Sequence, residues 1–286
     1  MATVKKLFIF STTFLSGIAV LITIICLATE QWIYTDKLKI VSKDNFIGYY
    51  NHLKYGLFQG TYRQVVPTTN AYQITITCLA EKNICAFICA NSTDMRYSIL
   101  KDIYDGKDVN INIDNCPKVS TYHQYYNRPI QLHISSNSVE KIYINCGVWV
   151  STILFLVISI TFGFISASLS LYNTVSNPVQ VYLSIYGLFV YTAIAACSSS
   201  IAIILWGIHY HKNIFHNVAF FYTLTGEMSS DKTAYLGYSY WLNLIPIVLY
   251  ISSICVLYAR EYLISRDPKQ KIVHREEHGD PIIYLY

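Results

Sequence analysis

The chain has 286 residues, of which 53% are hydrophobic and only 13% are charged. Soluble domains carry about 25% charged residues, so this chain has too few polar side chains to cover a surface exposed to water. The composition excludes a disordered chain, a coiled coil and a free cytosolic enzyme, and it indicates a membrane protein. The net charge is only +4, and no basic run is interleaved with aromatic residues, so we expect no nucleic-acid partner.

Long stretches without Asp, Glu, Lys or Arg predict four membrane-spanning helices, at residues 7–29, 147–171, 182–207 and 236–259. At ~1.5 Å per residue, each is long enough to cross a hydrocarbon core of ~30 Å. The first span also has some features of a cleaved signal peptide. Its apolar stretch, however, exceeds the ~7–15 residues typical of such a segment, and we expect it to be retained.

Lysine and arginine in the short segments predict the orientation. Two lysines precede the first span and five basic residues follow the fourth, whereas residues 208–235 contain only two. Both termini are therefore expected in the cytoplasm of a multi-pass plasma-membrane protein. This assigns a cytoplasmic N-terminus (1–6), a first extracellular loop (30–146), a cytoplasmic turn (172–181), a second extracellular loop (208–235) and a cytoplasmic tail (260–286).

All four tryptophans lie at predicted span ends. With this topology they would share the outer interface, where the amphipathic indole ring is favoured. Chance placement is the alternative, and it leaves the topology unchanged. The four are Trp32, Trp149, Trp206 and Trp241.

The first loop alternates apolar and polar residues at 73–77, 109–113 and 130–134. A period of two is typical of half-buried antiparallel strands. The predicted fold class is therefore an α-helical membrane protein, a four-helix bundle with a small antiparallel β-sheet in the first extracellular loop.

Four cysteines of this loop, Cys78, Cys85, Cys89 and Cys116, predict two disulfides, and three pairings remain open. Zinc is disfavoured because paired Cys-x-x-Cys units are absent. Asn91 begins an Asn-Ser-Thr sequon, which predicts a glycan if the loop is extracellular.

The spans contain no Asp, Glu, Lys, Arg or His, the residues on which proton relays and ion pathways depend. Three histidines follow the third span, but no His-Glu-x-x-His motif accompanies them. We expect no enzyme, no catalytic residue, no metal and no cofactor. Small residues at four-residue spacing predict close helix contacts, for which packing within the chain is favoured over packing against a second molecule. They are Ser159, Gly163 and Ala167, and Ala195 with Ser199; Pro246 predicts a kink in the fourth span.

The chain ends Tyr284-Leu285-Tyr286. A terminus with apolar side chains at the last and third-last positions can add as a strand to a PDZ-type groove. The tail therefore suggests a cytoplasmic PDZ or actin-linked partner, while the bilayer surrounds the spans and the first loop faces membrane or extracellular proteins.

Several short blocks of the sequence are distinctive. They are Trp32 after the first span, Tyr55, Gly56, Leu57, Phe58 and Gly60, Tyr172, Asn173, Asn177 and Pro178 of the inner turn, and Trp241. Together these blocks resemble the clarin family, within the claudin-like superfamily of four-span proteins. Residues 67–135 are longer than the corresponding clarin loop, so the resemblance does not say what this loop recognises. Claudins themselves fit less well, because no spaced cysteine pair follows the Gly-Leu-Phe segment.

The resemblance implies a non-enzymatic plasma-membrane protein that organises membrane or cytoskeletal complexes. Clarins are associated with sensory-cell bundles, synapses, actin organisation and membrane-protein trafficking. Two alternatives share the architecture: an auxiliary subunit of an ion channel or transport complex, and a claudin-like adhesion protein.

Overall fold

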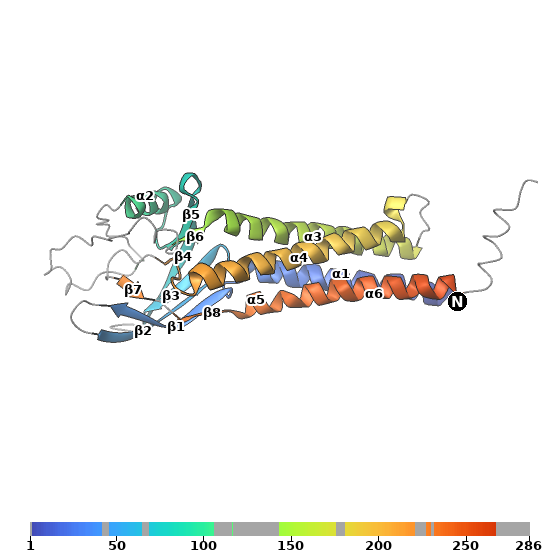
Figure 1. Ribbon diagram of the computed structural model, residues 1–286, viewed down its shortest axis with the longest axis horizontal. Coiled ribbons are helices and arrows are strands. Elements are labelled where there is room, and N and C mark those ends of the chain that lie inside the picture. The colour runs from blue at the N-terminus through green and yellow to red at the C-terminus, as the bar shows by residue number, and fades with distance from the viewer. Residues whose placement is uncertain are drawn as a thin grey trace, which may run out of the picture. The chain divides into compact units, whose positions relative to one another are not determined.

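Four helices of the computed structural model are long and apolar enough to cross a membrane (Figure 1). They confirm the predicted number of spans. The structure describes residues 2–41, 46–64, 69–105, 116, 143–175, 181–220, 227–229 and 232–266. The helices are α1 (Ala2–Ala28), α3 (Cys146–Val175), α4 (Ile185–His209, continued by a π turn, Tyr210–Ile214), and α5 (Tyr238–Leu242) followed by α6 (Leu244–Ser265).

Large apolar side chains lie exposed on each of the four spans. Examples are Phe14 on α1, Leu154 on α3, Ile204 on α4 and Val248 on α6, which are between 54% and 60% exposed. Exposed apolar side chains in such number are unfavourable in water and expected in lipid. The surface of the helices therefore supports the membrane assignment that composition suggested.

The fourth span is interrupted near its beginning. The short helix α5 ends at Leu242, Asn243 forms a turn, and α6 begins at Leu244. Pro246 has no N–H to donate to the carbonyl of Leu242, four residues earlier, and its ring crowds that carbonyl. The missing hydrogen bond accounts for this interruption, and the kink at Pro246 stays a prediction.

The chain divides into two compact units, and the first comprises Met1–Leu21, Ser159–Cys197 and Pro246–Tyr286. Small and hydroxyl-bearing side chains bring its helices together. Ser159 donates a hydrogen bond of 3.0 Å to the carbonyl of Ala195, and a Cβ at Gly163 would overlap the Tyr250 hydroxyl. The small-residue spacing thus marks contacts within the chain, as predicted for Ser159, Gly163 and Ala195.

The second unit comprises Ile22–Ile158 and Ser198–Ile245 and contains the antiparallel sheet. Among the described residues the strand order is β6-β5-β4-β3-β2-β1-β7, and β8 also pairs with β1. The predicted strand at 73–77 lies within β4, whereas 109–113 and 130–134 lie outside the described residues. The strands are β1 (Ile33–Val41), β2 (Phe46–Tyr55), β3 (Gln59–Gln64), β4 (Asn70–Leu79), β5 (Ile84–Ile88), β6 (Ile144–Asn145), β7 (Glu227–Ser229) and β8 (Ala234–Leu236).

Two loops contribute to the sheet, the first between α1 and α3 and the second between α4 and α5. The edge strands β7 and β8 come from the second loop and pair with β1 of the first loop, with Thr35 opposite Ala234. The sequence predicted strands in the first loop only. Because the second loop is hydrogen-bonded into the same sheet, the two loops form one structure.

A helix that the sequence did not predict, α2 (Thr93–Tyr104), covers part of the sheet. Ser92 caps it by accepting a 3.2 Å hydrogen bond from the Met95 N–H. Its buried face, formed by Ile99, Leu100 and Ile103, packs in one apolar cluster with residues of β4 and β5. Figure 1 shows α2 beside the ends of β4 and β5.

Candidate functional site

Most of the residues that resemble the clarin family, from the first loop and the beginning of the fourth span, lie at a junction in the second unit, where the sheet meets the ends of the helices. Its centre is the turn from Tyr55 to Gly60, which joins β2 to β3. The Gly56 N–H donates to the Gln59 carbonyl at 2.8 Å and closes the turn. A Cβ at Gly56 would overlap the carbonyl oxygen of Thr29 and lie 3.0 Å from its carbonyl carbon, just beyond the end of α1. Only glycine lets these two backbone segments approach so closely.

Trp32 connects the segment that follows α1 to this turn. Its backbone N–H donates to the Tyr55 carbonyl at 3.0 Å, and its indole Nε1 donates to the Cys26 carbonyl at 2.7 Å. The ring packs edge-on against Trp206 of α4, with 5.6 Å between ring centroids. Both tryptophans are fully buried. The two rings therefore form the apolar centre of the junction and do not face lipid, while the placement of all four tryptophans at the outer interface stays a prediction.

Trp149 joins the same turn to the first part of α3. Its indole Nε1 donates to the carbonyl of Leu57 at 2.7 Å, and its ring stands edge-on to that of Phe58 at 6.4 Å. Leu57 is fully buried, and Phe58 is 42% exposed. Adjacent residues of the turn thus serve different contacts, one inside the junction and one at its rim.

The beginning of the fourth span completes the junction. The Gly237 N–H donates to the Trp32 carbonyl at 2.8 Å, and the hydroxyls of Ser239 and Thr29 are 2.7 Å apart. The Tyr240 ring lies 6.3 Å from that of Trp32. Trp241, which follows, is 56% exposed and is the tryptophan placed best for a headgroup boundary.

The polar groups of the junction support packing more readily than acid–base chemistry. Burial, with a smaller contribution from Tyr210, raises the pKa of the Tyr55 phenol above its usual value and keeps it neutral. Glu30 accepts a 2.8 Å hydrogen bond from the hydroxyl of Thr61. No nucleophile beside a base is seen among the described residues of this junction. The arrangement holds a sheet against helix ends.

The inner-turn residues lie in the first unit. The Asn173 amide donates to the carbonyl of Leu169 at 2.8 Å and to that of Leu183, in a short 3₁₀ turn (Val181–Leu183), at 2.7 Å. It therefore joins the end of α3 to the approach to α4. Tyr172 is exposed, while Asn177 and Pro178 lie outside the described residues.

Both predicted disulfides are present, and the structure selects one of the three pairings: Cys78 with Cys85, and Cys89 with Cys116. Cys78 and Cys85 are directly opposite each other on β4 and β5. Cys89 follows β5, and its bond joins that strand end to a residue 27 positions further on. Asn91 is exposed just before α2, and its glycosylation stays a prediction. Tyr284, Leu285 and Tyr286 lie outside the described residues.

Each of the three histidines after the third span lies beside an aromatic ring. His209 is buried at the end of α4, 6.0 Å from the Trp206 ring. His211 and His216 are exposed, and both rings lie beside Phe215, at 6.4 and 5.4 Å. They are packed against aromatic neighbours. The group of three potential metal ligands found among the described residues consists instead of Cys78, Cys85 and Cys146.

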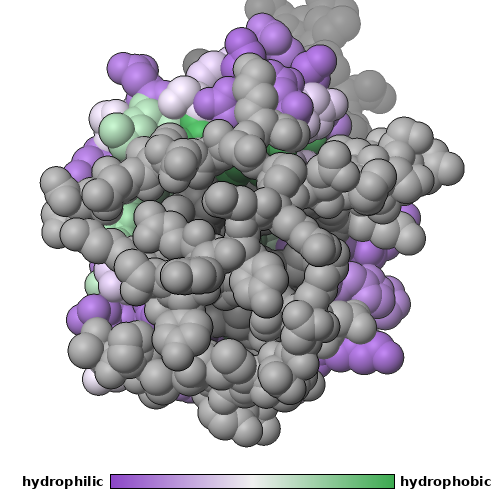
Figure 2. Space-filling model, turned by 90° about the vertical axis from the view of Figure 1, so that its left-hand side faces the viewer, coloured by the Kyte–Doolittle hydropathy of each residue, from purple (hydrophilic) through white to green (hydrophobic). Residues whose placement is uncertain are grey.

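Figure 2 views the molecule from its sheet side. The described side chains around the rim of this face are mostly hydrophilic, with smaller hydrophobic areas between them. The face differs from the sides of the helices, where large apolar residues are exposed. This contrast is expected when helices lie in lipid and the loops lie in water.

No protein-family model matches the chain. A stretch of 106 residues is 30% identical to Clarin-3 of Homo sapiens, and it covers 37% of this chain and 47% of Clarin-3. The chain thus spans about half the length of the curated relative that it matches. The chain also has four apolar helices and an antiparallel sheet, most of whose strands lie between the first and second of these helices. The fold is claudin-like. The match is compatible with a clarin-like or claudin-like four-span membrane protein.

Proposed function

We propose that the protein is a non-enzymatic plasma-membrane organiser, whose sheet presents a fixed extracellular surface to membrane or extracellular proteins. Both termini lie in the cytoplasm in this proposal. The tail then couples the complex to a PDZ or actin-linked protein. A clarin-like role in sensory cells or synapses is part of the proposal through the resemblance of the motif residues to the clarin family.

The observation that carries this proposal is the junction between sheet and helix ends. Backbone contact at Gly56, the buried pair Trp32 and Trp206 and the indole bond of Trp149 each connect the first loop to a different helix. Two disulfides and the strands of the second loop constrain the same sheet. A surface held in this way loses little conformational entropy on binding, which favours recognition of a partner.

The spans supply a second argument, by contrast with pumps and channels. Their sequences contain no Asp, Glu, Lys, Arg or His between residues 7–29, 147–171, 182–207 and 236–259. Buried positions in the first unit are instead occupied by hydroxyl residues bonded to neighbouring helices, such as Ser166 with Thr192 at 2.7 Å. Such bonds satisfy polar groups in lipid and stabilise helix contacts. These contacts support a packed helix bundle, in contrast to the spans of pumps and channels.

Proximity labelling in cells that express the full chain tests the organising role. A biotin ligase fused to the N-terminus should label a set of membrane and cytoskeletal proteins. Capture dominated by one channel or transporter would favour the auxiliary-subunit role. Ion flux through liposomes that contain only the purified chain would refute the organising role and favour a channel.

A matched pair of variants in the tail tests the proposed cytoplasmic PDZ partner. Tyr286→Asp should abolish capture of PDZ proteins, because the last side chain enters the groove. Leu285→Asp should preserve it, since alternate residues of an added strand point away from the groove. Equal capture by both variants and the unaltered chain would discard the PDZ partner while leaving the extracellular role in place.

A further inference from the structure

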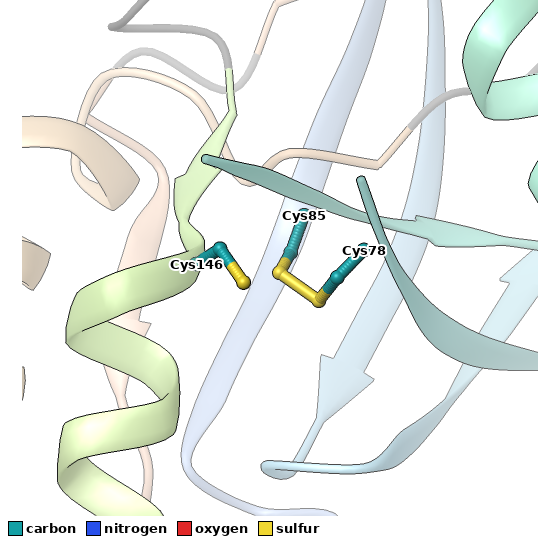
Figure 3. Close-up of side chains that lie close together, drawn as sticks. All are labelled: Cys78, Cys85 and Cys146. Carbon is teal, nitrogen blue, oxygen red and sulfur yellow. A yellow bond between two sulfur atoms is a disulfide. The ribbon is translucent and has the colours of Figure 1, made fainter. Parts of the chain in front are cut away.

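Three sulfur atoms meet at one corner of the sheet. The Sγ atoms of Cys78, Cys85 and Cys146 all lie within 4.8 Å of one another. Cys78 and Cys85 form a disulfide, and Cys146 is a free, buried thiol. Figure 3 shows the Cys146 side chain pointing toward the disulfide from the side of Cys85.

Strand register brings these cysteines together. Cys78 is opposite Cys85 on β4 and β5, and Cys85 is opposite Ile144 on β6. Cys146 follows β6 directly, as the first residue of α3. Its position beside the disulfide is therefore a consequence of the sheet.

The turn before β5 holds the beginning of α3 in this place. The Asn83 carbonyl accepts a 3.2 Å hydrogen bond from the Cys146 N–H, and the Asn83 side-chain oxygen accepts a 2.8 Å bond from the Gly147 N–H. Asn83 adopts the left-handed backbone conformation, with φ of 55°, that this tight turn needs. The thiol is thus fixed against the hairpin that carries the disulfide.

We propose that Cys146, Cys85 and Cys78 form a thiol–disulfide exchange site in which the bond moves from Cys78–Cys85 to Cys85–Cys146. The Cys146 thiol first loses its proton to water. The thiolate attacks Sγ of Cys85, a Cys146–Cys85 bond forms, and the Cys85–Cys78 bond breaks. The electron pair leaves with Cys78, which takes a proton from water. No net oxidation or reduction occurs, so the exchange needs no co-reactant.

Exchange changes what the crosslink joins. The initial bond ties two neighbouring strands of a hairpin, whereas the product ties β5 to the first residue of α3. It also releases Cys78, which is partly exposed, as a free thiol on β4. That thiol is the form able to make a mixed disulfide with an oxidised cysteine of a second protein. The site therefore links the attachment of the sheet to the availability of a reactive thiol.

Disulfide mapping of the full chain in its native membrane tests the exchange. Membranes are acid-quenched, the protein is denatured, and free thiols are alkylated with N-ethylmaleimide before digestion without reduction. Trypsin cleavage after Lys82 separates Cys78 from Cys85, and chymotrypsin cleavage after Tyr143 and Trp149 releases Cys146. The unaltered protein should yield both the Cys78–Cys85 and the Cys85–Cys146 crosslinked peptides. Their ratio should approach equilibrium faster at mildly alkaline pH, because the thiolate is the attacking species.

Two variants separate exchange from incomplete oxidation. Cys146→Ser should reduce alkylation of Cys78 by about tenfold or more, because nothing remains to displace it. Cys255→Ser, which removes an exposed cysteine of α6, should leave the pattern unchanged. Cys78–Cys85 as the sole crosslink of these three cysteines at every pH, or Cys78 alkylation that persists in Cys146→Ser, would overturn the proposal. Neither result depends on the proposed organising role.

Discussion

Replacing Gly56 with alanine tests the junction most sharply. The new Cβ would overlap the Thr29 carbonyl oxygen and lie 3.1 Å from Cα of Glu30. These are backbone atoms of the segment that leaves α1, so no side-chain rotation can relieve the contact. The Thr29 N–H is itself hydrogen-bonded to the Ile25 carbonyl at 3.1 Å, which limits how far this segment can move.

The expected cost follows from these constraints. Overpacking a well-ordered site costs about 1–3 kcal/mol, and a fixed backbone places Gly56→Ala near the upper end. If the segments separate instead, the hydrogen bond from the Trp32 N–H to the Tyr55 carbonyl is lost, which costs about 1 kcal/mol. About 3 kcal/mol in a chain of this size lowers the midpoint of thermal unfolding by roughly 6–12 °C.

Intrinsic fluorescence of the purified protein in detergent provides the assay, because Trp32 and Trp206 are buried at this junction. Gly17→Ala is the control: a Cβ there would meet nothing within 4 Å, and alanine favours the helix by up to about 1 kcal/mol. Its midpoint should match or exceed that of the unaltered protein. A Gly56→Ala midpoint equal to that of the unaltered protein would refute the junction as a close backbone contact.

Three further substitutions, two of them with a matched control substitution, test other contacts in the same assay. Trp149→Phe removes the indole bond to the first-loop turn and should cost about 1 kcal/mol, whereas Trp241→Phe at an exposed position should be close to neutral. Asn173→Ala removes both amide hydrogen bonds at the inner turn and should cost about 1–2 kcal/mol. Thr174→Ala removes a hydroxyl that bonds to the Ser170 carbonyl of its own helix and should cost less. Cys89→Ser opens a crosslink between residues 27 apart, for which loop-closure entropy gives about 3–4 kcal/mol, and destabilisation below about 1 kcal/mol would count against that mechanism.

The spans were predictable because a helix in lipid needs a long uncharged run, which is visible in one sequence. Their ends were less predictable because polar residues can be satisfied within the helix. Thr174 donates to the Ser170 carbonyl at 2.9 Å, so α3 continues to Val175 through residues that the sequence suggested were a turn. The helix break before Pro246 followed from covalent geometry alone.

The sheet was only partly predictable. The alternation at 73–77 marked β4, which has a half-buried pattern. By contrast, all residues of β5 (Ile84–Ile88) are buried, so this strand shows no alternation to detect. Strands β7 and β8 have three residues each, which is too few to give a periodic signal. Their pairing with β1 depends on contacts distant in the chain.

The junction shows what a single sequence cannot convey. The motif residues could be named from resemblance, but the roles of the tryptophans depended on packing. In the sequence, all four tryptophans appeared equivalent because each lies at the end of a span. In the structure, Trp32 and Trp206 are buried against each other. The sequence predicted that there are two disulfides but not which cysteines pair. The register of β4 against β5, which places Cys78 opposite Cys85, selects the pairing.

Membrane topology provides the most direct test of the proposed organiser. Epitope tags at the two termini can be stained before and after selective permeabilisation of the plasma membrane, with glycosidase treatment of the same protein and of an Asn91→Gln variant. The account predicts that both tags stain only after permeabilisation and that Asn91 carries a glycan removed by the glycosidase. Staining of either tag on intact cells would contradict a chain that crosses the membrane four times and presents its sheet outside.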